Sequence, residues 1–181
     1  MDRILAAQRL TVADLLPSTA MARLAKDDET GGAVPVVPHA VALFEPVIRP
    51  SAVEMVLQLP VAALQAVRAR ASNARRAWER FVAIRVPMAD SLPMEPLVLP
   101  DAIVLIDRHY NSLQPYRPNR PNLYAVRQGA HLTLRYSEFL SSRLVLRPLS
   151  AAFPLSLIEV EPGESVNDLL TGRIVFILNG L

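Results

Sequence analysis

The residue types that most often carry catalysis or bind metals are scarce in this sequence. Cysteine is absent, which excludes disulfides, thiolate metal sites and a cysteine nucleophile, and fits a reducing compartment. His39, His109 and His131 are well separated and show no spacing typical of a ligand pair, so we expect no metal site. Gly31-Gly32 is not followed by a phosphate-loop pattern. We therefore expect neither a metal nor a cofactor, which leaves serine, lysine and arginine as candidates for chemistry.

Almost all of the positive charge is arginine. Lys26 is the only lysine among 19 basic residues, and the formal net charge is +2. A desolvated lysine can lose its proton and act as a base, whereas a guanidinium stays protonated at physiological pH. A net charge this small does not by itself argue for nucleic-acid binding.

Length and composition predict one folded core. Of the 181 residues, 51% are apolar, so general disorder is not expected. Sixteen prolines against six glycines indicate rigid connections. No apolar run approaches the roughly 20 residues that span a bilayer, and the N-terminus lacks the apolar core of a secretory signal. We expect a cytoplasmic protein without a membrane partner.

Three segments precede the strand-rich part of the chain. Residues 1–26 are predicted as a helical leader, a possible remnant of a helix-turn-helix domain. Residues 27–59 are predicted as a proline-rich linker, but an unusually apolar one, which we expect to lie against the β domain as an edge strand or in a groove. Residues 60–82 are predicted as an amphipathic helix, because apolar residues recur at three and four positions.

The arginines of the 60–82 segment leave three interpretations open. The face that includes Arg68, Arg75 and Arg76 could be solvated while the apolar stripe packs on its own domain, which is the interpretation we favour. The stripe could instead pair with a second helix. The arginines could also bind phosphates or an acidic partner, with an affinity for nucleic acid that falls steeply with salt.

From Phe81 onward the pattern changes from helical to strand-like. Turn residues such as Gln128-Gly129 separate short apolar runs without intervening long helices. Residues 83–181 are therefore predicted as a mainly β domain, a small bent sheet or partly open barrel. The seven runs are 81–86, 102–107, 122–127, 131–136, 143–147, 155–160 and 172–178.

The connection from Asp107 to Asn122 is long for a link between strands and carries arginine, asparagine and tyrosine. It could be a recognition surface. The commoner explanation is a proline-braced loop that packs Tyr110 and Tyr116 onto the β domain.

The order of these elements resembles the C-terminal domain of LexA and phage repressors. That family has a Gly-Asp-Ser-Met-Glu-Pro loop, an apolar strand ending in aspartate, a strand bearing a lysine and a final Gly-Arg-Val strand. This chain has, in the same order, Asp90-Ser-Leu-Pro-Met-Glu-Pro96, Ala102–Asp107, Leu132-Thr-Leu-Arg135 and Gly172-Arg-Ile-Val175. The likeness covers residues 83–181 and is carried by the ordered set.

The resemblance implies a serine nucleophile and a lysine base, and both positions differ here. Aligning on Met94 places Pro93 at the nucleophile position. Aligning on the preceding Asp-Ser pair recovers Ser91 instead, but Leu92 and Pro93 then stand between this serine and the methionine. The lysine position falls on Arg135, which cannot act as a general base. The family's Ala-Gly and Cys-Gly cleavage dipeptides are absent.

These joint losses predict a pseudopeptidase in which Ser91, Pro93 and Arg135 are degenerate positions and no residue is catalytic. The domain would be the non-catalytic regulatory and dimerisation module of a repressor-like transcription regulator. The alternative is an active self-cleaving serine peptidase that uses Ser91 with an unrecognised base. We favour the first, so we do not expect an enzyme.

A peptidase-like cleft without catalysis could still bind a peptide. We expect this cleft to include Met94, Glu95 and Arg135, and the apolar linker around Val36 and Val37 to dock there in cis. The resemblance also implies a homodimer through the β domain. DNA would be bound only indirectly, through a missing or partner helix-turn-helix domain.

Overall fold

The computed structural model describes residues 31–67, 75–119 and 121–180. The predicted leader over residues 1–26, including Lys26, lies outside the described residues. The chain divides into two compact units, residues 1–33 with 58–66 and residues 34–57 with 67–181.

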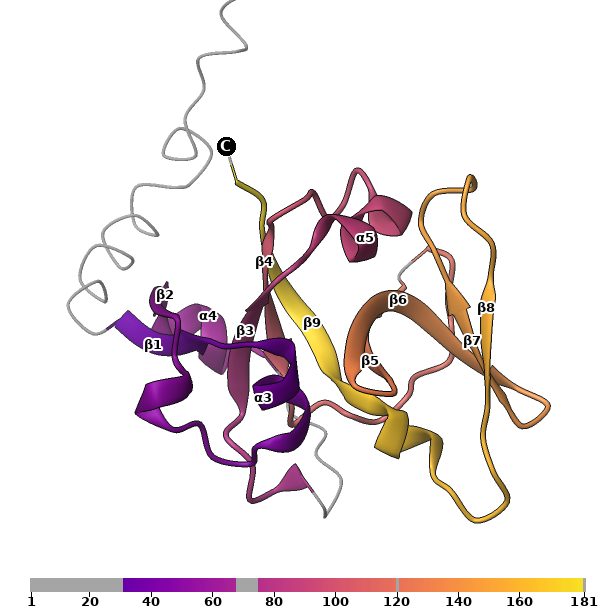
Figure 1. Cartoon of the computed structure of the whole chain (residues 1–181), viewed down its shortest axis with the longest axis horizontal. Helices are drawn as coiled ribbons and strands as arrows, with labels where there is room; N and C mark the ends of the chain where they lie inside the picture. The colour runs from indigo at the N-terminus through magenta and orange to yellow at the C-terminus, as the bar shows by residue number, and fades with distance from the viewer. Residues whose placement is uncertain (1–30, 68–74, 120, 181) are drawn as a thin grey trace, which may run out of the picture. The chain divides into compact units, whose positions relative to one another are not determined.

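Nine strands form one mixed sheet in the order β2-β1-β3-β4-β9-β5-β6-β7-β8 (Figure 1). β1 pairs in parallel with β3, and the described pairs from β3 through to β8 are antiparallel. The sheet is not closed into a barrel, and the prediction of a mainly β, bent and open fold is confirmed. The strands are β1 (Gly31–Val36), β2 (Met55–Pro60), β3 (Phe81–Arg85), β4 (Ile103–Asp107), β5 (Leu123–Gln128), β6 (His131–Leu140), β7 (Arg143–Arg147), β8 (Ser156–Glu159) and β9 (Leu170–Leu178).

The sheet bends along β6, whose two halves pair with different strands. Its first half pairs with β5 and its second half with β7, and Figure 1 shows this strand curving strongly. Two apolar clusters result. The larger one contains Val82 and Ile84 of β3 and Leu134 of β6, and the smaller one contains Leu144 and Leu146 of β7. Apolar side chains at alternate positions along these strands are thus buried in the two clusters.

Helices are few and short in the described residues. They are α3 (His39–Phe44), α4 (Val61–Gln65) and α5 (Met88–Ser91), with 3-10 turns η2 (Pro50–Ala52), η4 (Leu92–Met94) and η5 (Val166–Leu169). Of these, α3 packs beside β3 and β6, and α5 packs beside β6. These two helices matter most below because they carry polar residues to one place.

In the smaller unit the structure describes residues 31–33 and 58–66. There α4 follows directly on the end of β2 and buries Leu64. A Cβ built on Gly32 would lie 2.5 Å from Leu64 Cδ1, so Leu64 would have to shift if Gly32 carried a side chain.

The prediction of one helix over residues 60–82 is wrong. The helix α4 ends at Gln65, residues 76–80 form turns and bends, and Phe81 begins β3. The spacing was ambiguous because Trp78 and Phe81 are three residues apart, which suits a helix. In the structure the Trp78 ring contacts the guanidinium of Arg75 at 3.7 Å instead of packing on a helical stripe. Arg68 lies outside the described residues.

The segment predicted as a linker over residues 27–59 contributes β1 and most of β2 to the sheet, with α3 and η2 between them. Val36 pairs with Ala83 of β3, and the Val37 amide donates a hydrogen bond to the Ala83 carbonyl at 2.9 Å. Two of its prolines fall at helix starts and do not oppose this structure. Pro38 precedes the first turn of α3 and Pro50 begins η2.

Candidate functional site

The loop that resembles the family's nucleophile loop is compact and largely buried. After β3, the chain forms α5 and then η4, and the Glu95–Pro96 peptide bond is cis. Ser91 is the last residue of α5 and is fully buried, and its Oγ donates a hydrogen bond to the Met88 carbonyl at 3.0 Å. The Ser91 hydroxyl therefore already has a partner within its own helical turn.

Pro93, the other candidate for the nucleophile position, has a structural role. Its carbonyl accepts hydrogen bonds from the amides of Leu149 and Ser150, at 2.9 and 3.0 Å. The segment after β7 is thereby attached to η4. A proline has no nucleophilic side chain, so the contribution of Pro93 is to hold these two loops together.

Arg135 lies on β6 and is half-buried. Its Nη1 donates a hydrogen bond to the carbonyl of Leu134 at 2.6 Å. Burial lowers the pKa of Arg135, and the nearby charge of Asp90 opposes that change. A guanidinium with an anionic neighbour favours the protonated state, which suits hydrogen bonding and charge balance rather than proton abstraction.

Asp90 is the point at which the polar residues of three elements meet. Burial raises the pKa of Asp90, and the charges of His39, Arg135 and His131 act in the opposite direction. His39 comes from α3, Asp90 from α5, and His131 and Arg135 from β6. We call these four residues the Asp90 cluster.

Arg135 was predicted from the sequence as a residue of the site, whereas His39 and His131 were not. His39 and His131 are far apart in the chain and share no motif, so no local signal links them. The fold brings both within electrostatic reach of Asp90, and His39 Nε2 lies 2.9 Å from the Arg85 carbonyl, within hydrogen-bond distance. Among the described residues, no group of three or more histidine, aspartate or glutamate side chains is placed to hold a metal ion.

The residues of the predicted peptide cleft differ in burial. Val36, Val37 and Met94 are buried, with relative exposures of 0%, 1% and 0%. Val37 and Met94 lie in the same apolar cluster, so the apolar segment packs in cis beside the loop that carries Met94. Glu95 and Arg135 are half-buried. A peptide-binding cleft at this place stays a prediction.

A second polar network surrounds the end of β4 and was also missed. Arg108 is fully buried, and burial lowers its pKa to about 10. Its guanidinium donates to the carbonyls of Glu45, Glu79 and Pro46, at 2.7, 2.8 and 3.2 Å. These bonds tie the segment after α3 to the start of the main sheet, which identifies Arg108 as a structural residue.

The loop from Asp107 to Asn122 packs against the domain. Tyr110 is buried in the smaller cluster, and Tyr116 packs on the larger one with its ring centroid 6.4 Å from that of Tyr136. The prediction that this loop packs Tyr110 and Tyr116 onto the β domain therefore agrees with the positions of both tyrosines.

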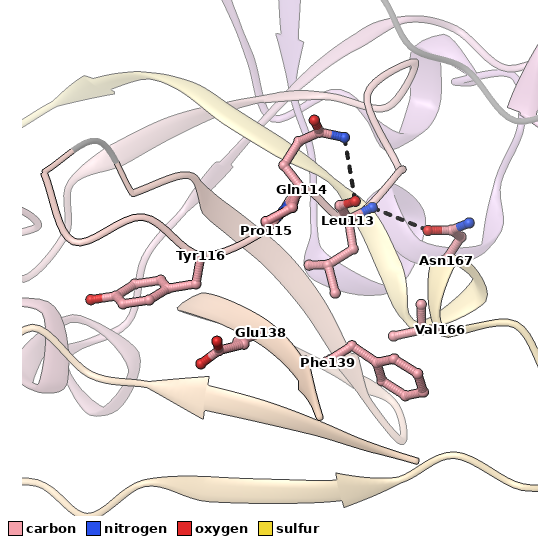
Figure 2. A pocket seen from close by; sticks show the side chains of 8 residues that line it. All are labelled: Leu113, Gln114, Pro115, Tyr116, Glu138, Phe139, Val166 and Asn167. Atoms are coloured by element: carbon pink, nitrogen blue, oxygen red, sulfur yellow. Dashed lines mark hydrogen bonds between the residues drawn. The ribbon is translucent and has the colours of Figure 1, made fainter. Parts of the chain in front are cut away.

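This loop also forms one wall of a hollow of about 440 Å³, shown in Figure 2. The Leu113 amide donates to Asn167 Oδ1 at 3.1 Å, which holds the loop to η5. On the opposite wall Glu138 accepts from Arg147 at 2.6 Å, and Phe139 is partly exposed. Glu138 is the carboxylate of this lining, and it is already paired with Arg147. The surface left for a ligand is therefore mainly apolar.

No protein-family model matches this chain, and a search of curated proteins finds no match. The likeness to LexA-type domains therefore rests on the motifs and the order of elements. Within the described ranges, no helix has the length and apolar character needed to cross a membrane.

Proposed function

We propose that the β-rich part of this chain is a pseudopeptidase of LexA type, acting as the non-catalytic regulatory and dimerisation module of a repressor-like transcription regulator. The observation that carries the proposal is Arg135. It occupies the position of the family's lysine base, and its guanidinium interacts with the carboxylate of Asp90. A serine nucleophile needs a neighbour that can accept its proton, and a guanidinium cannot do so.

The environment of Ser91 supports the same conclusion. Its hydroxyl is buried and donates to the Met88 carbonyl. An attacking serine must instead be accessible to the scissile carbonyl and share its proton with a base. In the Asp90 cluster burial and the neighbouring charges act on Asp90 in opposite directions, which fits a structural or sensing role.

The competing function is an active self-cleaving peptidase that uses Ser91. One observation favours it, namely that His39 and His131 act on Asp90, the neighbour of Ser91. Histidine is the commonest general base in proteins, so these two rings are the first candidates for the base that this alternative leaves unrecognised.

A homodimer is expected from the family resemblance. The strand β8 is the last in the sheet order, and one edge of its backbone has no strand partner among the residues that the structure describes. Leu155 and Leu157 at this edge are 54% and 56% exposed. An isologous contact between two such edges would bury these leucines and complete the strand pairing. Contact with DNA would come only through a helix-turn-helix domain on this or another chain.

Sedimentation equilibrium of the full chain tests the dimerisation proposal. We expect twice the chain mass at micromolar concentration, and we expect Leu157→Glu to weaken the dimer by at least about tenfold, because a charge would be buried at the contact. Val47→Glu is the matched control, since Val47 is 62% exposed and lies on a different part of the chain. A monomer at every concentration would contradict the proposal.

A further inference from the structure

A small polar hollow lies between the long loop and β9. It has a volume of about 290 Å³ and is lined by Tyr110, Gln114, Pro115, Arg117, Asn122 and Arg173. Two of these side chains are guanidinium groups, and none of them carries a carboxylate. We call this hollow the Arg173 pocket. A concave site lined by charge of one sign concentrates ions of the opposite sign.

The backbone of β9 is distorted on both sides of Arg173. Its pairing with β4 shifts register between the partners of Leu105 and Ile106, and its pairing with β5 shifts between the partners of Ala125 and Val126. Arg173 lies between the two irregularities. Register shifts of this kind re-aim side chains and are common beside functional sites.

Gly172 makes this arrangement possible. A Cβ at this position would lie 2.8 Å from the carbonyl carbon of Asp107, and that contact is with backbone, which cannot easily move away. The close approach of β9 to β4 next to Arg173 therefore depends on glycine.

The Arg173 guanidinium is held in position but is only partly used. Its Cζ lies 4.2 Å from the centroid of the buried Tyr110 ring, and Nη1 makes a long hydrogen bond of 3.5 Å to Asn122 Oδ1. Its Nε is buried and has no hydrogen-bond partner in the described part of the chain. A buried donor without a partner is costly and calls for an explanation.

The carboxylate expected to neutralise Arg173 is already occupied. Asp107 is the β4 residue paired with Arg173 across the sheet, yet both of its oxygens bind Arg80, at 3.1 and 3.0 Å. The exposed Arg117 adds a second positive charge at the rim of the pocket. The pocket thus keeps a net positive charge.

We propose that the Arg173 pocket binds a small oxyanion, the phosphate or carboxylate group of a small molecule. Arg173 anchors the anion through charge-assisted hydrogen bonds, because its planar guanidinium matches both groups. Arg117 adds attraction from the rim, and the amides of Asn122 and Gln114 offer neutral contacts. The volume is at the small end for ligand pockets, so the ligand is small. This inference goes beyond the proposed regulatory role and does not depend on it.

Titration of the full chain with inorganic phosphate and, separately, with malonate tests the inference. The two series are followed by amide chemical shifts at constant ionic strength. We expect saturable shifts around residues 110–117, 122 and 173, and the tighter anion identifies the ligand class. Arg173→Gln should weaken binding by at least about tenfold, and Arg117→Gln by less, because Arg117 sits at the exposed rim.

Arg143→Gln is the matched control, because Arg143 is exposed, lies on β7 and pairs with Glu159. It should bind as the unchanged chain does. The inference is overturned if neither anion saturates, or if Arg143→Gln weakens binding as much as Arg173→Gln. Should Arg173→Gln fail to fold, Arg117→Gln decides the matter, and an unchanged affinity in that variant would contradict the inference.

Discussion

At the scale of single residues, Asp90 is where opposing electrostatic effects can be separated. Burial favours its neutral form, and the charges of His39, His131 and Arg135 favour its ionised form. The pKa of Asp90 is raised, so burial is the stronger effect. The folded state therefore binds this proton more tightly than the unfolded state does. Stability then falls as pH rises from the unfolded pKa, about 3.9, through the folded one, and the penalty is complete above it.

Asp90→Asn removes that penalty. We expect the variant to be slightly more stable than the unchanged chain at neutral pH. The difference should vanish well below the unfolded-state pKa of about 3.9, where Asp90 is protonated in both the folded and the unfolded state. Urea unfolding at a series of pH values measures this difference. Asp101→Asn is the control because Asp101 is exposed. A less stable Asp90→Asn at neutral pH would mean that the electrostatic effects of His39, His131 and Arg135 on Asp90 outweigh burial.

Single residues were also the hardest to predict from the sequence. Arg108 gives no sign in the sequence that it is fully buried, because its acceptors are backbone carbonyls of Glu45, Pro46 and Glu79. Every residue has a backbone carbonyl, so acceptors of this kind leave no pattern in the sequence. His39 and His131 were missed for a related reason, since their shared neighbour Asp90 becomes visible only when α3, α5 and β6 are packed together.

At the scale of elements, the segment from β1 to α3 completes the core. Val37 is buried in the larger cluster together with Met94, so it stabilises both the early segment and the loop that carries Ser91. Removing that contact should loosen both parts.

Val37→Asp places a charge in the core without a partner. We expect it to lower the free energy of unfolding by at least about 3 kcal/mol and to make residues 31–57 sensitive to protease. Val47→Asp introduces the same charge at an exposed site and should change stability by less than about 0.5 kcal/mol. Urea unfolding and limited proteolysis measure the two effects. Equal stability of the two variants would show that this segment is not part of the core.

Strands were predicted better than helices. Each of the seven predicted runs from Phe81 onward overlaps a strand of the structure, because alternation and turn residues are local signals. The strands β1 and β2 lie in the segment that was predicted to pack on the β domain as an edge strand or in a groove. Their bounds were not predicted, because Pro35, Pro60 and the glycines at positions 31 and 32 argue locally against strands. The helix over residues 60–82 was predicted too long because three-residue spacing alone does not distinguish a helix from a turn followed by a strand.

At the scale of the whole molecule, the open mixed sheet follows from the strand pattern, but its connections do not. The parallel pairing of β1 with β3 joins segments that no turn links directly. Long-range pairing of this kind depends on which faces can be buried together, and a single sequence does not specify it. The Asp90 cluster and the Arg173 pocket both arise from such long-range packing, which is why neither was predicted as a unit.

The loss of catalysis is the central claim, and self-cleavage tests it most directly. The purified full chain is incubated at neutral and alkaline pH and its intact mass is then measured, alongside Ser91→Ala and Arg135→Lys. Alkaline pH is included because it deprotonates a lysine base. We predict an unchanged mass in all three proteins at both pH values, because Ser91 is buried and the cleavage dipeptide is absent. A cut in the unchanged chain that disappears in Ser91→Ala would contradict the account and make this chain a peptidase with an unrecognised base.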